Sequence, residues 1–196
     1  MTIHIERLTG AEMPAALPAL ARLRISEFLD WPYLYNGTLN YEEIYLKEFA
    51  ASLGAVIVVA RNGDDIVGVS TGAPLAHHQA EFGAPFRKAG FDVSRVFYFG
   101  ESVLNPKFRR QGIGHRFFDE REAHARGLGG FTHTTFCSVV RPDDHPAKPP
   151  NATPLDAFWL KRGYEKIPGL IANFSWPDVG ELAESSKLMQ FWMRAL

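Results

Sequence analysis

The sequence has one cysteine, no excess of charge of either sign and no long hydrophobic run. Cys137, alone among 196 residues, excludes an intramolecular disulfide and a cysteine-rich metal site, and it suits a reducing compartment. Lys and Arg number 21 against 22 Asp and Glu, so no basic field attracts nucleic acid or an anionic membrane surface. No apolar stretch has the length of a signal peptide or of a bilayer-spanning helix. We expect a soluble cytoplasmic protein that binds neither nucleic acid nor membrane.

The hydrophobic pattern predicts strands and helices that alternate within one domain over residues 1–196. Apolar residues at helical spacing predict helices, and turn residues between β-branched runs separate strands. Helices are expected at 11–29 and 41–53, short ones within 75–93, and strands at 2–8, 55–60, 66–71, 96–104, 131–140, 164–167 and 170–176. The last two strands flank Pro168-Gly169 and are expected to form a hairpin.

Residues 178–196 are expected to form a C-terminal extension. Its large apolar side chains argue against a disordered tail. They are Leu182, Leu188, Phe191, Trp192 and Leu196. They pack either on the same chain or on a second copy, and a homodimer stays open because no sequence feature decides between the two.

The most informative stretch is a strand that runs into a glycine turn and then a helix. The strand, 96–104, is rich in β-branched and aromatic residues, and Asn105-Pro106 ends it because proline cannot donate to a ladder. Arg109-Arg110-Gln111-Gly112-Ile113-Gly114 follows, and the two glycines let the backbone approach a bulky anion. The free amides and the positive dipole end of the next helix favour phosphate. An ordinary turn with two solvated arginines is the alternative.

The order strand, Asn-Pro, Arg-x-x-Gly-x-Gly and helix resembles the acyl-CoA motif of the GNAT superfamily of N-acetyltransferases. Arg109, Gly112 and Gly114 match its pattern. The resemblance implies that the loop amides hold the CoA pyrophosphate and that the end of the preceding strand pairs with the pantetheine. The residues implied to bind acetyl-CoA are Ser102, Val103, Leu104, Arg109, Arg110, Gln111, Gly112, Ile113, Gly114, His115 and Phe158.

A second stretch, 155–165, has a short helix that ends at Gly163 and passes into a strand. It is similar to the GNAT segment that packs beside CoA, and Ala157, Gly163 and Tyr164 fit that pattern. Trp159 departs from it, because many family members carry there a tyrosine that protonates the leaving thiolate. An indole N–H cannot act as a general acid near neutral pH, so that role passes to another group or to water. Tyr164 follows the glycine where phenylalanine is usual, and it is expected to be a packing residue.

The resemblance also implies the fold. The class is α/β, with a mixed, mostly antiparallel central sheet of about seven strands flanked by helices. In the GNAT layout the sheet is splayed between strands four and five, and the thioester meets the amine in that gap.

Two loops are expected to line the acceptor site. Trp31, Tyr33 and Tyr35 lie in a loop after the first helix, and the family layout favours a substrate wall there over a loop folded on the core. Arg141, Asp143, Asp144 and His145 leave the fifth strand and are placed to rim the gap, although a solvated loop is the alternative. Arg141 suggests a carboxylate on the substrate, because a guanidinium can hold one bidentately.

Glu101 is the candidate general base. It is the only acid from Arg95 to Leu104, in an otherwise apolar strand. Burial disfavours the charged form of a carboxylate, and this is the environment that a base uses. A surface position or a pair with a nearby arginine is the alternative. The backbone amide of Leu104 is the candidate for oxyanion stabilisation.

These features predict an acetyl-CoA-dependent N-acetyltransferase for a small-molecule primary amine, working by direct attack. The alternatives are a catalytically inactive acyl-CoA-binding regulatory module, which Trp159 makes credible, and an acetyltransferase for a protein N-terminus or lysine. No metal is expected, because the adjacent His77 and His78 do not share a helix face and lack further ligands at the right spacing. Cys137 is expected to be a buried apolar side chain.

Overall fold

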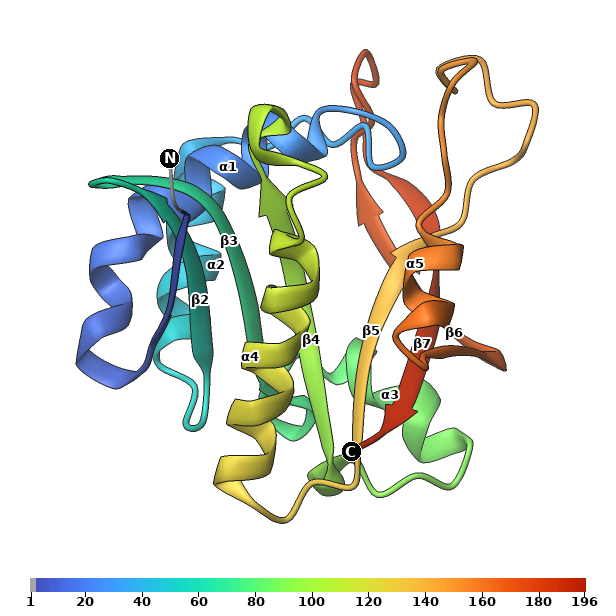
Figure 1. Cartoon of the computed structure of the whole chain (residues 1–196). Coiled ribbons are helices and arrows are strands. Elements are labelled where there is room, and N and C mark those ends of the chain that lie inside the picture. The colour runs from blue at the N-terminus through green and yellow to red at the C-terminus, as the bar shows by residue number, and fades with distance from the viewer. Residues whose placement is uncertain (1–2) are drawn as a thin grey trace.

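A seven-stranded sheet in the order β1-β2-β3-β4-β5-β7-β6 runs through the computed structural model, which describes residues 3–196 (Figure 1). The strands are β1 (His4–Leu8), β2 (Val56–Asn62), β3 (Asp65–Pro74), β4 (Val96–Leu104), β5 (His133–Val139), β6 (Glu165–Trp176) and β7 (Ser185–Ala195). The helices are α1 (Leu17–Phe28), α2 (Leu39–Ala50), α3 (Ala80–Lys88), α4 (Ile113–Leu128) and α5 (Asp156–Lys161). Only β4 and β5 pair in parallel among these strands. The predicted fold class is confirmed.

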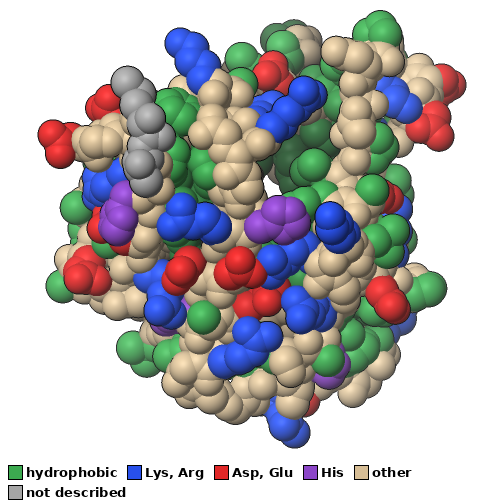
Figure 2. Space-filling view, in the orientation of Figure 1, with side chains coloured by type: hydrophobic (Ala, Val, Ile, Leu, Met, Phe, Trp, Pro, Cys, Tyr) green, Lys and Arg blue, Asp and Glu red, His purple; other side chains and the backbone are tan. Residues whose placement is uncertain are grey.

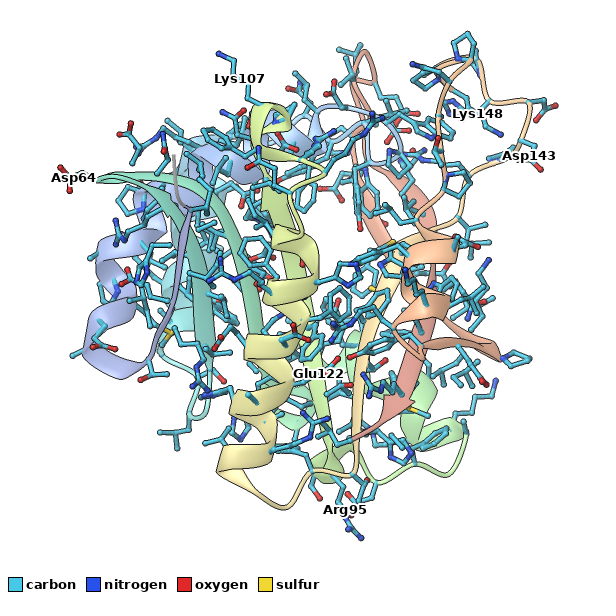
Figure 3. All side chains as sticks on the ribbon, in the orientation of Figure 1. Asp64, Arg95, Lys107, Glu122, Asp143 and Lys148 are labelled. Carbon is cyan, nitrogen blue, oxygen red and sulfur yellow. The ribbon has the colours of Figure 1, made fainter. Side chains whose placement is uncertain are left out.

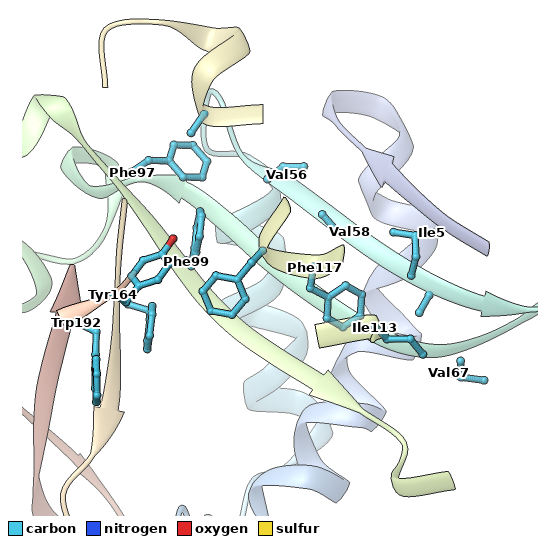
Figure 4. Packing of buried hydrophobic residues seen from close by; sticks show 14 residues of the cluster. Ile5, Val56, Val58, Val67, Phe97, Phe99, Ile113, Phe117, Tyr164 and Trp192 are labelled. Atoms are coloured by element: carbon cyan, nitrogen blue, oxygen red, sulfur yellow. The ribbon is translucent and has the colours of Figure 1, made fainter. Parts of the chain in front are cut away.

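Helices cover both faces of the sheet. In Figure 1, α4 and α5 lie in front, and α1, α2 and α3 lie behind. Under α4, Phe117 and Phe118 pack against Phe97 and Phe99 of β4 (Figure 4). Leu20 of α1 packs with α2 residues in a second core on the opposite face. Burying both faces of the sheet leaves its edges and the ends of its strands for function.

The gap between β4 and β5 is the main irregularity of the sheet. The two strands pair at Val96–His133, Phe97–Thr134 and Tyr98–Thr135 and then diverge, so the predicted splay is confirmed. Within residues 3–196, no strand pairs with the edge of β4 that faces β5 beyond Tyr98. That edge therefore presents backbone groups that an extended ligand can use as a strand.

A bulge in β4 opposite Thr71 sets the direction of Glu101. The register shifts there, so that Gly100 and Glu101 both face Thr71 across the ladder. Phe99, before the bulge, belongs to the core under α4, whereas Val103, after it, belongs to the core under α1 and α2. Because side chains alternate along a strand, Glu101 would lie on the α4 side without the extra residue. A Cβ on Gly100 would lie 2.4 Å from Oγ1 of Thr71, which explains the glycine.

The C-terminal part of the chain differs from the prediction. Residues 185–195, expected within an extension, form β7 in the sheet between β5 and β6, and Phe191 and Trp192 are buried there. The expected hairpin at Pro168-Gly169 is instead one continuous strand, β6, whose register against β7 shifts between Lys166 and Ile171. The Pro-Gly pair forms an irregularity within a strand because β7 supplies the partner that a hairpin would have supplied.

Two smaller points concern helices. The N-cap of α2 is Thr38, whose Oγ1 accepts from the amide of Tyr41 at 3.4 Å, so the helix begins earlier than predicted. In residues 3–196, no helix is both long enough and apolar enough to cross a membrane.

Candidate active site

The turn between β4 and α4 presents a row of free backbone amides. Arg110 (φ +63°) and Gly112 (φ +76°) both adopt the left-handed conformation, and Gly112 is the N-cap of α4. The first amide to pair again is that of Arg116, which donates to the carbonyl of Gly112 at 3.3 Å. Within the described chain, the amides of residues 110–115 donate to no protein acceptor. Left-handed residues at a helix N-terminus make a concave amide surface that binds anions.

The two arginines of this turn lie at its edge. Arg109 pairs with Glu27 of α1, and its Nε is 3.4 Å from the carbonyl of Leu104. Arg110 is exposed. Arg109 thus connects α1 to the turn, while about half of its own side chain remains exposed. Figure 2 shows the surface hollowed between the α4 column and the β5–α5 side, with Lys and Arg side chains near the rim and hydrophobic ones inside.

The unpaired edge of β4 begins beside this turn. The amide of Asn105 donates to the carbonyl of Val67 on β3 at 2.9 Å. Because successive amides in a strand point to opposite sides, the amide of Leu104 points into the β4–β5 gap. The side chain of Val103 is buried in the core under α1 and α2, and Ser102 is exposed. Only the backbone of Val103 is therefore available to a ligand in the gap.

Helix α5 closes the other side of the anion turn. The ring of Phe158 lies 4.8 Å from the His115 ring, and a Cβ on Gly114 would meet Phe158 at 3.5 Å. The Trp159 ring packs 5.0 Å from the rings of both Phe136 and Trp192. Trp159 is thus a packing residue between α5 and the sheet, and an indole at this place offers no titratable proton.

Glu122 fastens α4 to α5 and β7. Figure 3 labels it on α4, and its Oε1 accepts from Arg162 at 3.0 Å, Arg194 at 3.2 Å and the Tyr164 hydroxyl at 3.2 Å. The Tyr164 hydroxyl also lies 2.7 Å from Thr134 Oγ1, and the ring is fully buried, as predicted. These bonds hold the α4 N-terminus and α5 in a fixed relation.

Glu101 is buried and paired with an arginine on α1. Arg24 donates through Nη1 to Glu101 and through Nε to Glu42 of α2. We call Arg24, Glu42 and Glu101 the Arg24 triad. Its two carboxylates face one guanidinium, which also lies 4.8 Å from the Tyr45 ring and 5.0 Å from the Phe28 ring. Burial works to lower the pKa of Arg24, but the charges of Glu101 and Glu42 outweigh it and raise that pKa above its ordinary value.

A second arginine supports the bulge from the opposite face. Arg121 of α4 donates through Nη1 to the carbonyls of Thr71, at 3.1 Å, and Glu101, at 3.4 Å. Its guanidinium lies 4.3 Å from the Phe99 ring and 4.9 Å from the Phe118 ring. Burial lowers the pKa of Arg121 to about 10, so it stays charged at neutral pH. The backbone at Glu101 is therefore held by α4 while its side chain is held by α1.

The aromatic loop after α1 lies beside the Arg24 triad. The Tyr33 ring is 4.6 Å from Phe28 and 6.3 Å from Trp176 on β6. Burial raises the pKa of the Tyr33 hydroxyl, Arg24 opposes this rise, and Cys137 and Glu101 add to it. Burial and then the Glu42 carboxylate raise the pKa of Tyr35. The loop thus places phenol groups close to the triad.

The rim residues meet this loop, but in a manner that the sequence did not reveal. Arg141 donates to Asp178 through two bonds, of 2.6 and 2.9 Å, and to the carbonyls of Pro32 at 2.9 Å and Tyr33 at 2.6 Å. Its side chain is 7% exposed. Lys187 lies 3.3 Å from Asp178 on the other side. Arg141 therefore anchors the aromatic loop across the gap, and a substrate-binding role for it stays a prediction.

The rest of the rim divides into two parts. The His145 ring lies 5.2 Å from the Trp31 ring, so the two predicted acceptor segments do meet. Asp143 and Asp144 are exposed, and Asp143 pairs with Lys148 at 2.8 Å on the projecting loop (Figure 3). Asp143 therefore takes no part in the hydrogen bonds by which Arg141 holds the aromatic loop.

The Arg141–Asp178 pair yields a stability prediction. Asp178→Asn is expected to lower the free energy of unfolding by about 3 to 5 kcal/mol, because it leaves a buried guanidinium without its counter-charge. Urea unfolding at pH 7 measures this. Asp143→Asn, at an exposed pair, is the matched control and should leave the urea midpoint unchanged. Equal effects of the two substitutions would contradict the assignment.

The stabilisation from the Arg141–Asp178 pair depends on pH. Burial works to raise the pKa of Asp178, but the bonds from Arg141 and Lys187 outweigh it and hold the pKa below its ordinary 3.8. Its stabilisation is therefore complete above the ordinary value and is lost as pH falls through the lowered one. Asp178→Asn should flatten that part of the stability profile.

Cys137 and the histidines have no catalytic or ligating arrangement in the described structure. The Cys137 sulfur lies 3.1 Å from the Tyr98 hydroxyl, and burial raises the thiol pKa to about 12, so the thiol stays protonated at pH 8. His77 Nδ1 is 3.0 Å from the Leu53 carbonyl, while the His78 ring packs 4.8 Å from Tyr98. Residues 3–196 contain no cluster of three or more His, Cys, Asp or Glu side chains that could hold a metal ion.

Solved structures share this fold at low sequence identity. A GNAT-family acetyltransferase from Streptococcus pneumoniae is 15% identical with a TM-score of 0.60, and each chain is covered completely. An acetyltransferase from Salmonella typhimurium, solved with its cofactor acetyl-CoA, is 12% identical with a TM-score of 0.63, covering 100% of this chain and 95% of the other. A phosphinothricin acetyltransferase from Sinorhizobium meliloti, in complex with AcCoA, is 14% identical with a TM-score of 0.61, covering 100% and 89%.

The sequence was also compared with curated proteins and with family models. No curated protein sequence matches the chain. The model of the Acetyltransferase (GNAT) family, however, matches residues 20–149, which include most of α1 and all of the aromatic loop, β4, the anion turn and the rim. The chain therefore belongs to the GNAT family of acetyltransferases.

Proposed function

We propose that the protein transfers the acetyl group of acetyl-CoA to the primary amine of a small molecule by direct attack. The observation that carries this proposal is the continuity of the unpaired β4 edge with the free amides of the anion turn. An elongated ligand with a pyrophosphate at one point and amides along its arm matches that arrangement. Relatives in this fold were solved with acetyl-CoA, which supports the same co-substrate here.

In the proposed site, the pyrophosphate lies on the amides of residues 110–115, with Arg109 and Arg110 at its edge. The pantetheine arm follows Ser102 to Leu104, and Phe158 and His115 flank it from the α5 side. This directs the thioester to the part of the gap beside Glu101. The residues present suit this ligand, since the turn is concave, cationic at its edge and free of competing backbone bonds.

The chemistry requires a neutral amine and a stabilised oxyanion. The amine nitrogen forms a bond to the thioester carbonyl carbon, the C–S bond breaks, and the amine proton passes to Glu101 directly or through water. In this proposal the Leu104 amide, which points into the β4–β5 gap, donates to the developing oxyanion. Glu42 shares the charge of Arg24, so Glu101 is not neutralised by a guanidinium of its own. The thiolate sulfur takes a proton from solvent, because the indole N–H of Trp159 is too weak an acid to supply one, and Glu101 returns the amine proton to solvent, so the protons balance.

One alternative has an observation in its favour. A catalytically inactive acyl-CoA-binding module would also keep the anion turn and the β4 edge, and Trp159, which packs between α5 and the sheet, cannot protonate a leaving thiolate. The two functions differ in what happens to bound acetyl-CoA. An enzyme releases CoA slowly to water without an amine, whereas a binding module leaves the thioester intact.

The test is CoA release from acetyl-CoA, followed with a thiol reagent at pH 8, with and without a panel of primary amines. Cys137 adds little background there, because its pKa is raised to about 12. Amine-dependent release supports the proposal. Binding of acetyl-CoA without release in any condition would favour the module, and a folded protein that binds no acetyl-CoA in calorimetry would end both.

A further inference from the structure

The charges around the proposed acceptor site are unevenly balanced. Glu101 and Glu42 carry two negative charges against the single positive charge of Arg24. Glu42 is fully buried, and within the described residues no charged group pairs with its Oε1; the neutral Tyr35 hydroxyl lies beside this carboxylate. A buried carboxylate oxygen without a partner is costly unless a cation lies near. The Arg24 triad therefore has a net negative charge and favours an added positive charge.

No cation of the site is free to hold an acid. Arg141 is bound bidentately by Asp178, and Lys187 lies against the same carboxylate. Arg109, at the anion turn, is paired with Glu27. Across the described aromatic loop, rim and triad, every Arg and Lys is paired with a carboxylate: Arg24 with Glu42 and Glu101, Arg141 with Asp178, and Lys148 with Asp143. A substrate carboxylate would therefore meet the negative excess of the triad without a guanidinium to receive it.

The walls of the site favour a cation with an apolar body. The rings of Tyr45 and Phe28 lie within 5.0 Å of the Arg24 guanidinium, and Tyr33 packs 4.6 Å from Phe28. The faces of Tyr45 and Phe28 already hold the Arg24 guanidinium, so the rings offer a substrate apolar surface, and the attraction for its charge comes from the two carboxylates. The triad and these rings together make a site with one charge to compensate and apolar surface around it.

We propose that the acceptor is a small primary amine with an aromatic or other apolar body and no carboxylate, and that Glu42 is a specificity-determining residue for its positive charge. This rests on the proposed acetyl transfer and narrows its substrate class. It replaces the carboxylate-bearing acceptor suggested by Arg141, because Asp178 already holds that guanidinium.

Three matched acceptors test the charge requirement in the unmodified protein: phenethylamine, phenylalanine amide and phenylalanine. We expect kcat/KM for phenethylamine to exceed that for phenylalanine at least tenfold. The amide has the bulk of the carboxylate without its charge, so it should recover most of the difference. A preference for phenylalanine, or an amide as poor as the acid, would overturn the proposal.

A variant tests the role of Glu42. Glu42→Gln keeps the shape of the side chain and removes one negative charge, so the KM for phenethylamine should rise at least tenfold while acetyl-CoA affinity stays within about twofold. Glu43→Gln, the same change at the exposed neighbour, is the control and should alter none of these. An unchanged KM in folded Glu42→Gln would overturn the assignment, and if this variant fails to fold the acceptor series still decides.

The outcomes separate this inference from the proposed function. If the protein binds acetyl-CoA and releases CoA slowly to water but acetylates none of the three compounds, the substrate class is wrong and the acetyltransferase site stands. If acetyl-CoA neither binds nor reacts, the proposed function fails first.

Discussion

Replacing Glu101 by Gln is expected to lower kcat about 100- to 10,000-fold, the range for losing a general base. The amide keeps the shape of the side chain but cannot accept the proton of the attacking amine. The fold should survive, because Arg24 keeps its pair with Glu42 and the bulge keeps its bonds from Arg121. Steady-state kinetics with acetyl-CoA and an accepted amine measure the loss.

Two readouts separate a base from a structural anchor at this position. The activity of Glu101→Gln should rise with pH, since more of the amine is then already deprotonated, while acetyl-CoA affinity stays at the wild-type level. A folded variant with full activity would move the base to Asp143, Asp144 or His145 acting through water. A variant that unfolds would show that Glu101 mainly anchors β4.

Replacing Gly112 by Val is expected to weaken acetyl-CoA binding about 100-fold, equivalent to about 3 kcal/mol or two lost charge-assisted bonds. Gly112 has φ +76° at the N-cap of α4, a conformation that a β-branched residue avoids. Relaxing it turns the neighbouring amides away from the anion, and the side chain occupies the concave face. Calorimetric titration of acetyl-CoA measures the change.

Gly90→Val is the matched control for this substitution. Gly90 also has a positive φ, +83°, and open space where a Cβ would project, but it follows α3, away from the anion turn. Both substitutions should cost similar backbone strain, and only Gly112→Val should weaken acetyl-CoA binding. Equal binding by the two folded variants would remove the pyrophosphate from the α4 turn.

The sequence predicted those parts of the structure that depend on local pattern. The strand 96–104, the turn through Gly112 and the helix after it are contiguous, and glycine spacing with a following apolar stripe is enough to identify them. The gap beside this strand came from the family resemblance. The C-terminal strand was missed because its partners, β5 and β6, lie elsewhere in the chain, and apolar residues alone do not reveal a partner.

The sequence left open a pair between Glu101 and a nearby arginine, but it did not identify Arg24 or Glu42 as members of that cluster, although it holds a signal for both. Arg24 lies 77 residues from Glu101, and a charged residue on a helix is normally assigned to its solvent face. Yet Arg24 follows Leu17 and Leu20 at helical spacing, and Glu42 precedes Leu46 in the same way, so both lie on apolar stripes. Opposite charges on the buried stripes of two consecutive helices predict a buried pair. A glycine within a strand often marks a bulge, so Gly100 was likewise a signal for the bulge that turns the Glu101 side chain toward Arg24.

Amide hydrogen exchange with and without acetyl-CoA locates the cofactor on the protein. We expect slower exchange on binding in peptides covering residues 99–116, which include the β4 edge and the free amides of the turn. Peptides covering Gly10–Ala16 follow β1, at the edge of the sheet away from the β4–β5 gap, and should exchange at the same rate in both states. Binding of acetyl-CoA without protection at residues 110–115 would rule out the proposed cofactor site, because the cofactor would then lie elsewhere on the protein.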